Sequence, residues 1–149
     1  MEITKAVVTD AETILALQKR AYHSEAELNN DFSILPLIQT IEQLRAEFSA
    51  KEILKVIIDD EIVGSGQATL ENGSVRIGRI IVHPDFWGRG IGSGILLALE
   101  SLFPAAARYE LFTGSKSHKN LAFYKSRGYK NFKTAISGKT ELVYLEKCK

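Results

Sequence analysis

The segment between Ile80 and Leu96 constrains the fold of this chain more than any other part of the sequence. An apolar, β-prone run meets a proline, and an apolar helical pattern begins after a cluster of four glycines, Gly88, Gly90, Gly92 and Gly94. Without β-carbons, the backbone amides of such a turn can lie against a bulky ligand. A helix from Ile91 to Phe103 would add its unpaired N–H groups and the positive end of its dipole. The pattern therefore predicts a strand–turn–helix junction that binds a phosphate-type anion.

Two familiar phosphate-binding loops do not match this sequence. The segment Gly138-Lys139-Thr140 has the end of a Walker loop, but Lys133 stands where that loop needs its first glycine. The dinucleotide fingerprint G-x-G-x-x-G fails because Ser93 and Ile95 occupy the positions of its third glycine. A turn whose glycines serve only helix packing remains the simpler alternative.

Charge is distributed unevenly along the chain. Residues 1–61 carry 12 acidic and 6 basic side chains, whereas residues 62–149 carry 6 acidic and 13 basic ones, for a net charge of +1. The basic part contains the glycine turn, which fits an anionic cofactor. The basic residues are scattered and form no nucleic-acid motif, so we expect no nucleic-acid partner.

The sequence favours a cytoplasmic protein without a metal or a membrane segment. No apolar run approaches the ~18 residues of a membrane span, and charged and polar residues follow Met1 in place of an apolar leader. Cys148 is the only cysteine, so no internal disulfide can form, which fits a reducing compartment. Three dispersed histidines give no metal-ligand spacing, and we predict no metal site.

Hydrophobic periodicity predicts a single α+β domain over residues 1–149. Four helices are expected, at residues 10–22, 37–48, 91–103 and 119–127. Seven strands are expected, at residues 3–8, 53–59, 62–70, 74–82, 109–113, 129–136 and 140–146. Asn72-Gly73 predicts a hairpin, and the polar stretch from His23 to Asn30 is interpreted as a loop. The order βααβββαβαββ predicts one mixed sheet of six to seven strands, mostly antiparallel.

Two motifs resemble those of the GNAT superfamily of acyl-CoA-dependent N-acetyltransferases. The first runs from Ile80 to Gly92 and is similar to the strand and pyrophosphate loop of that family. The second runs from Asn120 to Tyr129 and is similar to its second cofactor motif, an Asn, then a Tyr, then Gly-Phe/Tyr. Trp87 departs from the pattern, because the family usually begins this loop with Gln or Arg. Arg89 is the residue that could compensate for it.

The resemblance implies acetyl-CoA as the cofactor, with coenzyme A as the product. The pantetheine arm would pair with the main chain of Ile80 to Val82. The strand that carries these residues would splay from its parallel central neighbour at residues 109–113. The loop amides would hold the pyrophosphate. The cofactor-binding residues expected from the resemblance are Ile80, Ile81, Val82, Gly88, Arg89, Gly90, Ile91, Gly92, Ser93, Ser117 and Asn120.

The implied reaction is direct transfer of an acetyl group, in a ternary complex, to a primary amine of a small molecule or peptide. By resemblance, Tyr124 is the acid that protonates the leaving thiolate, and Asn120 faces the same side of its helix. A Tyr124 that only packs in the core beside Phe123 is the alternative. His83 is interpreted as a strand-end residue. The general base stays open between water and the carboxylates of Glu71, Asp85 and Glu110.

The acceptor is the least constrained part of this hypothesis. In the family fold, the segment between the first two helices borders the acceptor, and here it carries Tyr22, Glu25, Glu27 and Asp31. These acids would attract a cationic amine, so polyamine-, aminoglycoside- or lysine-like acceptors are expected over glycine or glutamate. A solvated loop would account for the same residues. Two other functions stay open: a catalytically silent acyl-CoA sensor, and a dimerisation module, so that a homodimer is possible.

Overall fold

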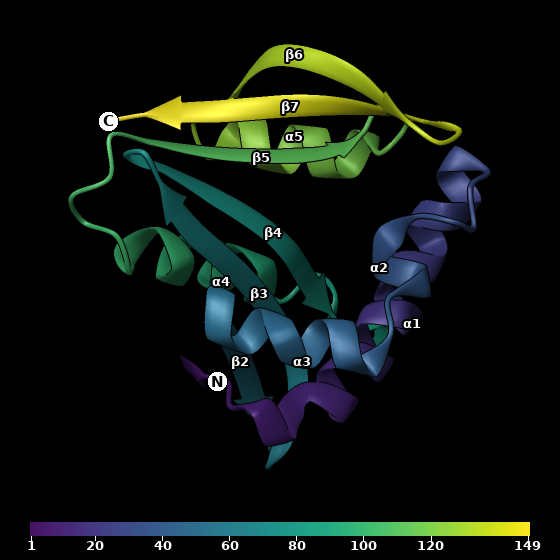
Figure 1. Cartoon of the computed structure of the whole chain (residues 1–149), viewed down its shortest axis with the longest axis vertical. Helices are drawn as coiled ribbons and strands as arrows, with labels where there is room; N and C mark the ends of the chain where they lie inside the picture. Colours follow the sequence, from purple (N-terminus) through teal and green to yellow (C-terminus); the bar gives the residue numbers. More distant parts are fainter.

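The computed structural model describes residues 1–149 and places seven strands in one mixed sheet (Figure 1). The strands cross the sheet in the order β1-β2-β3-β4-β5-β7-β6, and only the β4–β5 pair is parallel. The α+β class and the parallel central pair predicted from the sequence are confirmed. The strands are β1 (Glu2–Lys5), β2 (Glu52–Ile58), β3 (Glu61–Glu71), β4 (Ser74–Val82), β5 (Arg108–Gly114), β6 (Lys130–Ser137) and β7 (Thr140–Cys148).

The structure contains five α-helices where the sequence predicted four. They are α1 (Ala11–Asn29), α2 (Leu35–Ile38), α3 (Ile41–Ala50), α4 (Ile91–Ser101) and α5 (His118–Ser126). The predicted helix at residues 37–48 is divided because Thr40 is an N-cap. Its hydroxyl accepts a hydrogen bond from the amide of Gln43 at 3.2 Å, and this starts α3 afresh.

The first helix is longer than predicted, and the loop expected from His23 to Asn30 is wrong. Helix α1 continues to Asn29, and Asn30 ends it with a left-handed φ of 49°. The segment is polar but contains no glycine or proline, so nothing in it breaks a helix. Polar side chains were mistaken for a loop signal, although they lie on a helix that borders the cleft between β4 and β5.

Helices cover both faces of the sheet. Ile95 and Leu99 of α4 pack with Leu54 of β2 in the larger core cluster, whereas Ile53 of the same strand packs with Leu44 of α3 in a second cluster. Successive residues of a strand point to opposite faces, which explains this division. In Figure 1, α3 lies in front of the sheet and α4 behind it.

The strands β4 and β5 pair over a short stretch only. The paired residues are Ser74 with Arg108, Val75 with Tyr109, and Arg76 with Glu110. Beyond them the strands diverge, as the sequence predicted, so Ile80 to Val82 have no partner on the β5 side. Helix α1 reaches across this opening: it packs on β3 and β4, and the side chain of Asn29 lies against Gly114 at the end of β5.

The turns of the hairpins sit close to their predicted positions. Asn72 and Gly73 have φ values of 53° and 79°, the positive pair that a tight β3–β4 turn requires. The turn between β2 and β3 uses Asp59 and Asp60, one residue earlier than predicted. No helix of the structure combines the length and the apolar character that a membrane span requires.

Candidate active site

The glycine loop lies where β4 ends and α4 begins. Gly88 and Gly90 both have a φ of 78°, and Gly90 is the N-cap of α4. A Cβ atom added at Gly88, Gly90 or Gly92 would meet no other atom within 4 Å, so the surface in front of the loop is open. The first helical hydrogen bond runs from Gly94 N to Gly90 O at 3.1 Å, which leaves the amides of Ile91, Gly92 and Ser93 free. This cradle fits a pyrophosphate group.

The two unusual side chains of the loop take different positions. The indole N–H of Trp87 donates to the carbonyl of Val82 at 2.8 Å, so this residue ties the loop to the end of β4. The guanidinium of Arg89 lies 4.9 Å from the centre of the Phe86 ring on the exposed surface of the loop. Arg89 forms no ion pair in the protein and remains able to meet an anion.

Strand β4 contains a bulge beside the cleft. Gly66 of β3 faces both Arg79 and Ile80, because the flanking register pairs are Ser65–Ile81 and Gln67–Gly78. Arg79 has a φ of 53°, a left-handed conformation that is uncommon outside glycine. Its Nε atom is buried and has no hydrogen-bond partner. The sequence analysis missed this residue, although a glycine inside a strand pattern, here Gly78, is a known signal of a bulge.

Tyr124 lies on α5 with its ring packed 5.2 Å from that of Phe123 and 6.0 Å from that of Tyr129. Its hydroxyl forms no hydrogen bond in the protein. Burial raises the pKa of Tyr124 above the ordinary value of 10.0, and neighbouring Tyr22 and Glu25 raise it further. A raised pKa makes the phenol a weaker acid, while its hydroxyl remains available as a hydrogen-bond donor. The phenol therefore stays protonated.

Glu25 joins α1 to α5. One of its carboxylate oxygens, Oε2, accepts a short hydrogen bond from the hydroxyl of Ser117, and the other, Oε1, accepts one from Asn120 Nδ2 at 3.1 Å. The same Asn120 amide lies 3.3 Å from the hydroxyl of Thr113 on β5. The structure thus brings together residues that the sequence had placed in two sites, Ser117 and Asn120 with the cofactor and Glu25 with the acceptor.

The other predicted acceptor acids do not face the cleft as a group. Glu27 is exposed and pairs with His23 at 2.8 Å on the surface of α1. Asp31 is only 2% exposed and accepts hydrogen bonds from Ser33 and Thr140. The segment that was expected to be an acidic loop is helical up to Asn29, and Glu25 is the one acid of that segment that contacts the second motif.

Tyr22 completes the group around the cleft. Burial raises its pKa above the ordinary value of 10.0, the charge of Arg79 opposes this rise, and that of Glu25 adds to it. We refer to these five side chains as the cleft cluster: Tyr22, Glu25, Arg79, Asn120 and Tyr124. They come from α1, β4 and α5, and they meet where β4 and β5 diverge.

The carboxylates considered as general base lie elsewhere. Glu71 pairs with Arg76 at 3.3 Å, and Glu110 pairs with Arg108 at 2.9 Å, both at the end of the sheet where β4 begins. The Asp85 side chain is 75% exposed. Its neighbour His83 follows β4 as predicted and accepts a hydrogen bond from the Asp85 amide at 3.1 Å. The general base stays open.

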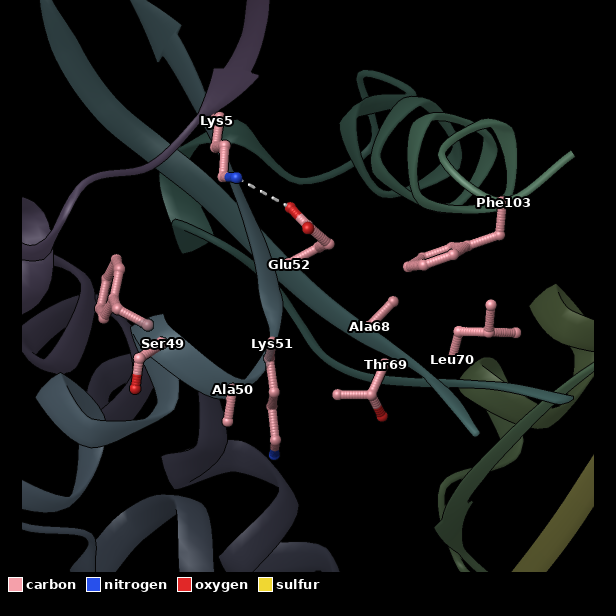
Figure 2. A pocket seen from close by; sticks show the side chains of 10 residues that line it. Lys5, Ser49, Ala50, Lys51, Glu52, Ala68, Thr69, Leu70 and Phe103 are labelled. Atoms are coloured by element: carbon pink, nitrogen blue, oxygen red, sulfur yellow. Dashed lines mark ion pairs between the residues drawn. The ribbon is translucent and has the colours of Figure 1, made fainter. Parts of the chain in front are cut away.

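A separate hollow of about 250 Å³ lies beside the C-terminal end of β3, at Ala68 to Leu70 (Figure 2). Its only carboxylate, Glu52, forms an ion pair with Lys5 at 3.2 Å, and Phe103 and Leu70 line one side. The charged side chains that line the hollow, Lys5, Glu52 and Lys51, all form ion pairs within the protein. We therefore assign no chemistry to the hollow. Nowhere in the chain do three or more His, Cys, Asp or Glu residues gather as metal ligands would.

Comparison with known families shows to which family the chain belongs. The sequence profile of the acetyltransferase (GNAT) family matches residues 12–129. The chain belongs to this family. Acetyl-CoA is the acyl donor of GNAT acetyltransferases, and the open cradle at Gly88 to Ser93 fits its pyrophosphate. No curated protein sequence matches the chain.

Solved structures support the GNAT fold over the whole chain. A PaiA N-acetyltransferase from Thermoplasma acidophilum, solved with coenzyme A, has a TM-score of 0.84 at 17% identity, covering 99% of this chain and 98% of that one. A ribosomal-protein-S18-alanine N-acetyltransferase from Escherichia coli has a TM-score of 0.81 at 13% identity, covering 99% and 92%. At such low identity, these likenesses establish the shared fold.

Proposed function

We propose that this GNAT protein is an enzyme that transfers an acetyl group from acetyl-CoA to a primary amine of a small molecule or peptide. The observation that carries the proposal is the early end of the β4–β5 pairing at Arg76 and Glu110. It opens the sheet between the glycine loop and α5, so a thioester could reach Tyr124 while its pyrophosphate lies at the start of α4. The thioester and the pyrophosphate of the cofactor would then each lie at a matching part of the cleft.

The donor side of the cleft consists mainly of backbone. The free amides of Ile91, Gly92 and Ser93 would bind the pyrophosphate, and the unpaired edge of Ile80 to Val82 would pair with the pantetheine arm. Arg89 adds a positive charge at the rim. Acetyl-CoA supplies the activated thioester for the reaction.

Tyr124 holds a proton on Oη at the point where the thiolate would leave. Its raised pKa keeps this proton in place across the working range of pH. The same burial disfavours the negative thiolate, so donation of a hydrogen bond or a proton from Oη offsets that cost.

Glu25 would hold the acceptor amine. Its two oxygens are fixed by Ser117 and Asn120, and each carboxylate oxygen retains a further lone pair for an ammonium or amine N–H. Tyr22, the third residue predicted for the acceptor site, lies beside Glu25. The exposed pair of Glu27 with His23 leaves Glu27 without this role.

The proposal is tested by following free thiol released from acetyl-CoA in the presence of a panel of amines. We expect release that depends on both protein and amine. A silent sensor would bind coenzyme A in calorimetry and release no thiol with any amine, whereas a dimerisation module would bind no cofactor.

The possible homodimer and the cytoplasmic location stay predictions. Strand β6 is an edge of the sheet, and all of its residues are exposed. An unpaired edge of this kind can pair with a second chain, and sedimentation of the purified protein would measure its oligomeric state.

A further inference from the structure

Arg79 is a charged side chain without a partner in the protein. Its guanidinium forms no ion pair or hydrogen bond, and its Nε atom is enclosed. A buried donor without a hydrogen-bond partner destabilises the protein, and more so when the group is charged. In the same strand, Arg76 pairs with Glu71 and Glu110, so the lack of a partner is specific to Arg79.

The backbone at Arg79 carries a second cost. A φ of 53° is strained in a residue with a side chain, and the bulge places that strain at the edge of the cleft. A glycine would remove the strain, but the position holds an arginine. Strain and an unpaired charge at one residue indicate a role in binding a ligand.

The surroundings of Arg79 define which ligand would fit. The charges of Arg79 and of the Glu25 carboxylate both act on the hydroxyl of Tyr22, so the two groups lie near the same phenol. That carboxylate, on α1, accepts hydrogen bonds from Ser117 and Asn120 and forms no ion pair with Arg79. The cleft therefore presents one positive and one negative group near the hydroxyl of Tyr22, and Tyr124 lies close to Tyr22 and Glu25.

We propose that Arg79 binds the carboxylate of the acceptor, and that the acceptor is an α-amino acid. The inference rests on the proposed function. The two terminal nitrogens of the guanidinium offer parallel N–H donors to the two oxygens of a carboxylate, and Glu25 receives the amine of the same molecule. This proposal replaces the expectation that polycationic amines are preferred over simple amino acids. That expectation rested on several acids of residues 23–31, and of these Glu27 pairs with His23, and Asp31 accepts hydrogen bonds from Ser33 and Thr140.

The test uses acceptors that differ only in the carboxylate. Lysine is compared with cadaverine and phenylalanine with phenethylamine, first in the wild-type protein and then in Arg79→Gln and Arg79→Lys. Gln keeps the backbone strain and removes the charge, so the fold is disturbed little, and thermal unfolding verifies this. Arg76→Gln, on the same strand but outside the cleft, is the matched control.

We expect the wild-type protein and Arg76→Gln to use each amino acid at least tenfold better, in kcat/KM, than its decarboxylated partner. Arg79→Gln should lose this preference, measured as the ratio of kcat/KM between the two members of each pair, and Arg79→Lys should keep part of it. Equal use of both acceptors by the wild-type protein, or an unchanged preference in Arg79→Gln, would overturn the assignment.

Calorimetry on the protein–coenzyme A complex separates failure of this inference from failure of the proposed function. Binding of the amino acid that is lost in Arg79→Gln supports the carboxylate site even if no acetyl transfer is detected. Turnover of plain amines without any amino-acid binding supports the enzyme and overturns the role of Arg79.

Discussion

Individual residues of the cleft owe their properties to neighbours from other elements. Tyr124 is a core-like tyrosine by its position on α5, yet Tyr22 and Glu25 of α1 raise its pKa. Glu25 was expected in a polar loop, yet it lies on α1, where Ser117 and Asn120 hold it in place. The chemistry therefore depends on the packing of α1 against α5.

The Tyr124→Phe variant removes only the hydroxyl that we assign to the leaving thiolate. We expect turnover to fall by roughly 100-fold, with acetyl-CoA affinity nearly unchanged, because the ring still packs against Phe123. Tyr144→Phe, on the exposed face of the sheet, is the control and should keep wild-type turnover. Wild-type rates in Tyr124→Phe, when chemistry limits the assay, would make Tyr124 a packing residue only.

At the scale of elements, the start of α4 carries the donor site. Gly92 is the cleanest position to test, because it lies in open space and lacks the positive φ of Gly90, where a side chain would also strain the backbone. Gly92→Val should weaken acetyl-CoA binding by at least roughly tenfold, about 1.4 kcal/mol, measured by calorimetry. Leu97→Val places the same β-branched residue at an exposed site of α4 and should bind as the wild type does. Equal affinity in both variants would mean that the cofactor does not lie on this loop.

The end of α1 is fastened to the β6–β7 hairpin by Asp31. Hydrogen bonds from Ser33, Thr140 and the Lys139 amide lower the pKa of Asp31 from 3.8 to about 2. A lowered pKa stabilises the fold at pH values above that of the unfolded carboxyl, and this contribution is lost as the pH falls from about 4 to about 2. It is fully present at neutral pH.

Asp31→Asn should therefore lower the urea midpoint of unfolding at pH 7, and the difference from wild type should shrink as the pH falls through that window. The exposed Asp85→Asn variant is the control and should leave the midpoint unchanged. A difference for Asp31→Asn that stays constant from pH 7 to pH 2 would show that its carboxylate charge has no part in fastening α1.

At the scale of the whole molecule, the sequence predicted what depends on local pattern. Alternation, turn residues and the glycine cluster predicted the succession of elements along the chain and the β4-to-α4 junction, because each is determined by neighbours along the chain. The polar run from His23 to Glu27 was misread because its partners, Ser117 and Asn120, lie about ninety residues away. The role of Arg79 depends on a bulge and on the helix that packs over it, and neither can be read from the strand alone.

The central claim is direct acetyl transfer in this cleft, and one labelling experiment tests it. The protein is incubated with [¹³C]acetyl-CoA, with and without an amine acceptor. The masses of the small molecules and of the intact protein are then measured by mass spectrometry. The account predicts a ¹³C-labelled N-acetyl amine when the acceptor is present and an unmodified protein mass in both reactions. A labelled protein that passes its acetyl group to the amine, or the absence of any N-acetyl product, would contradict it.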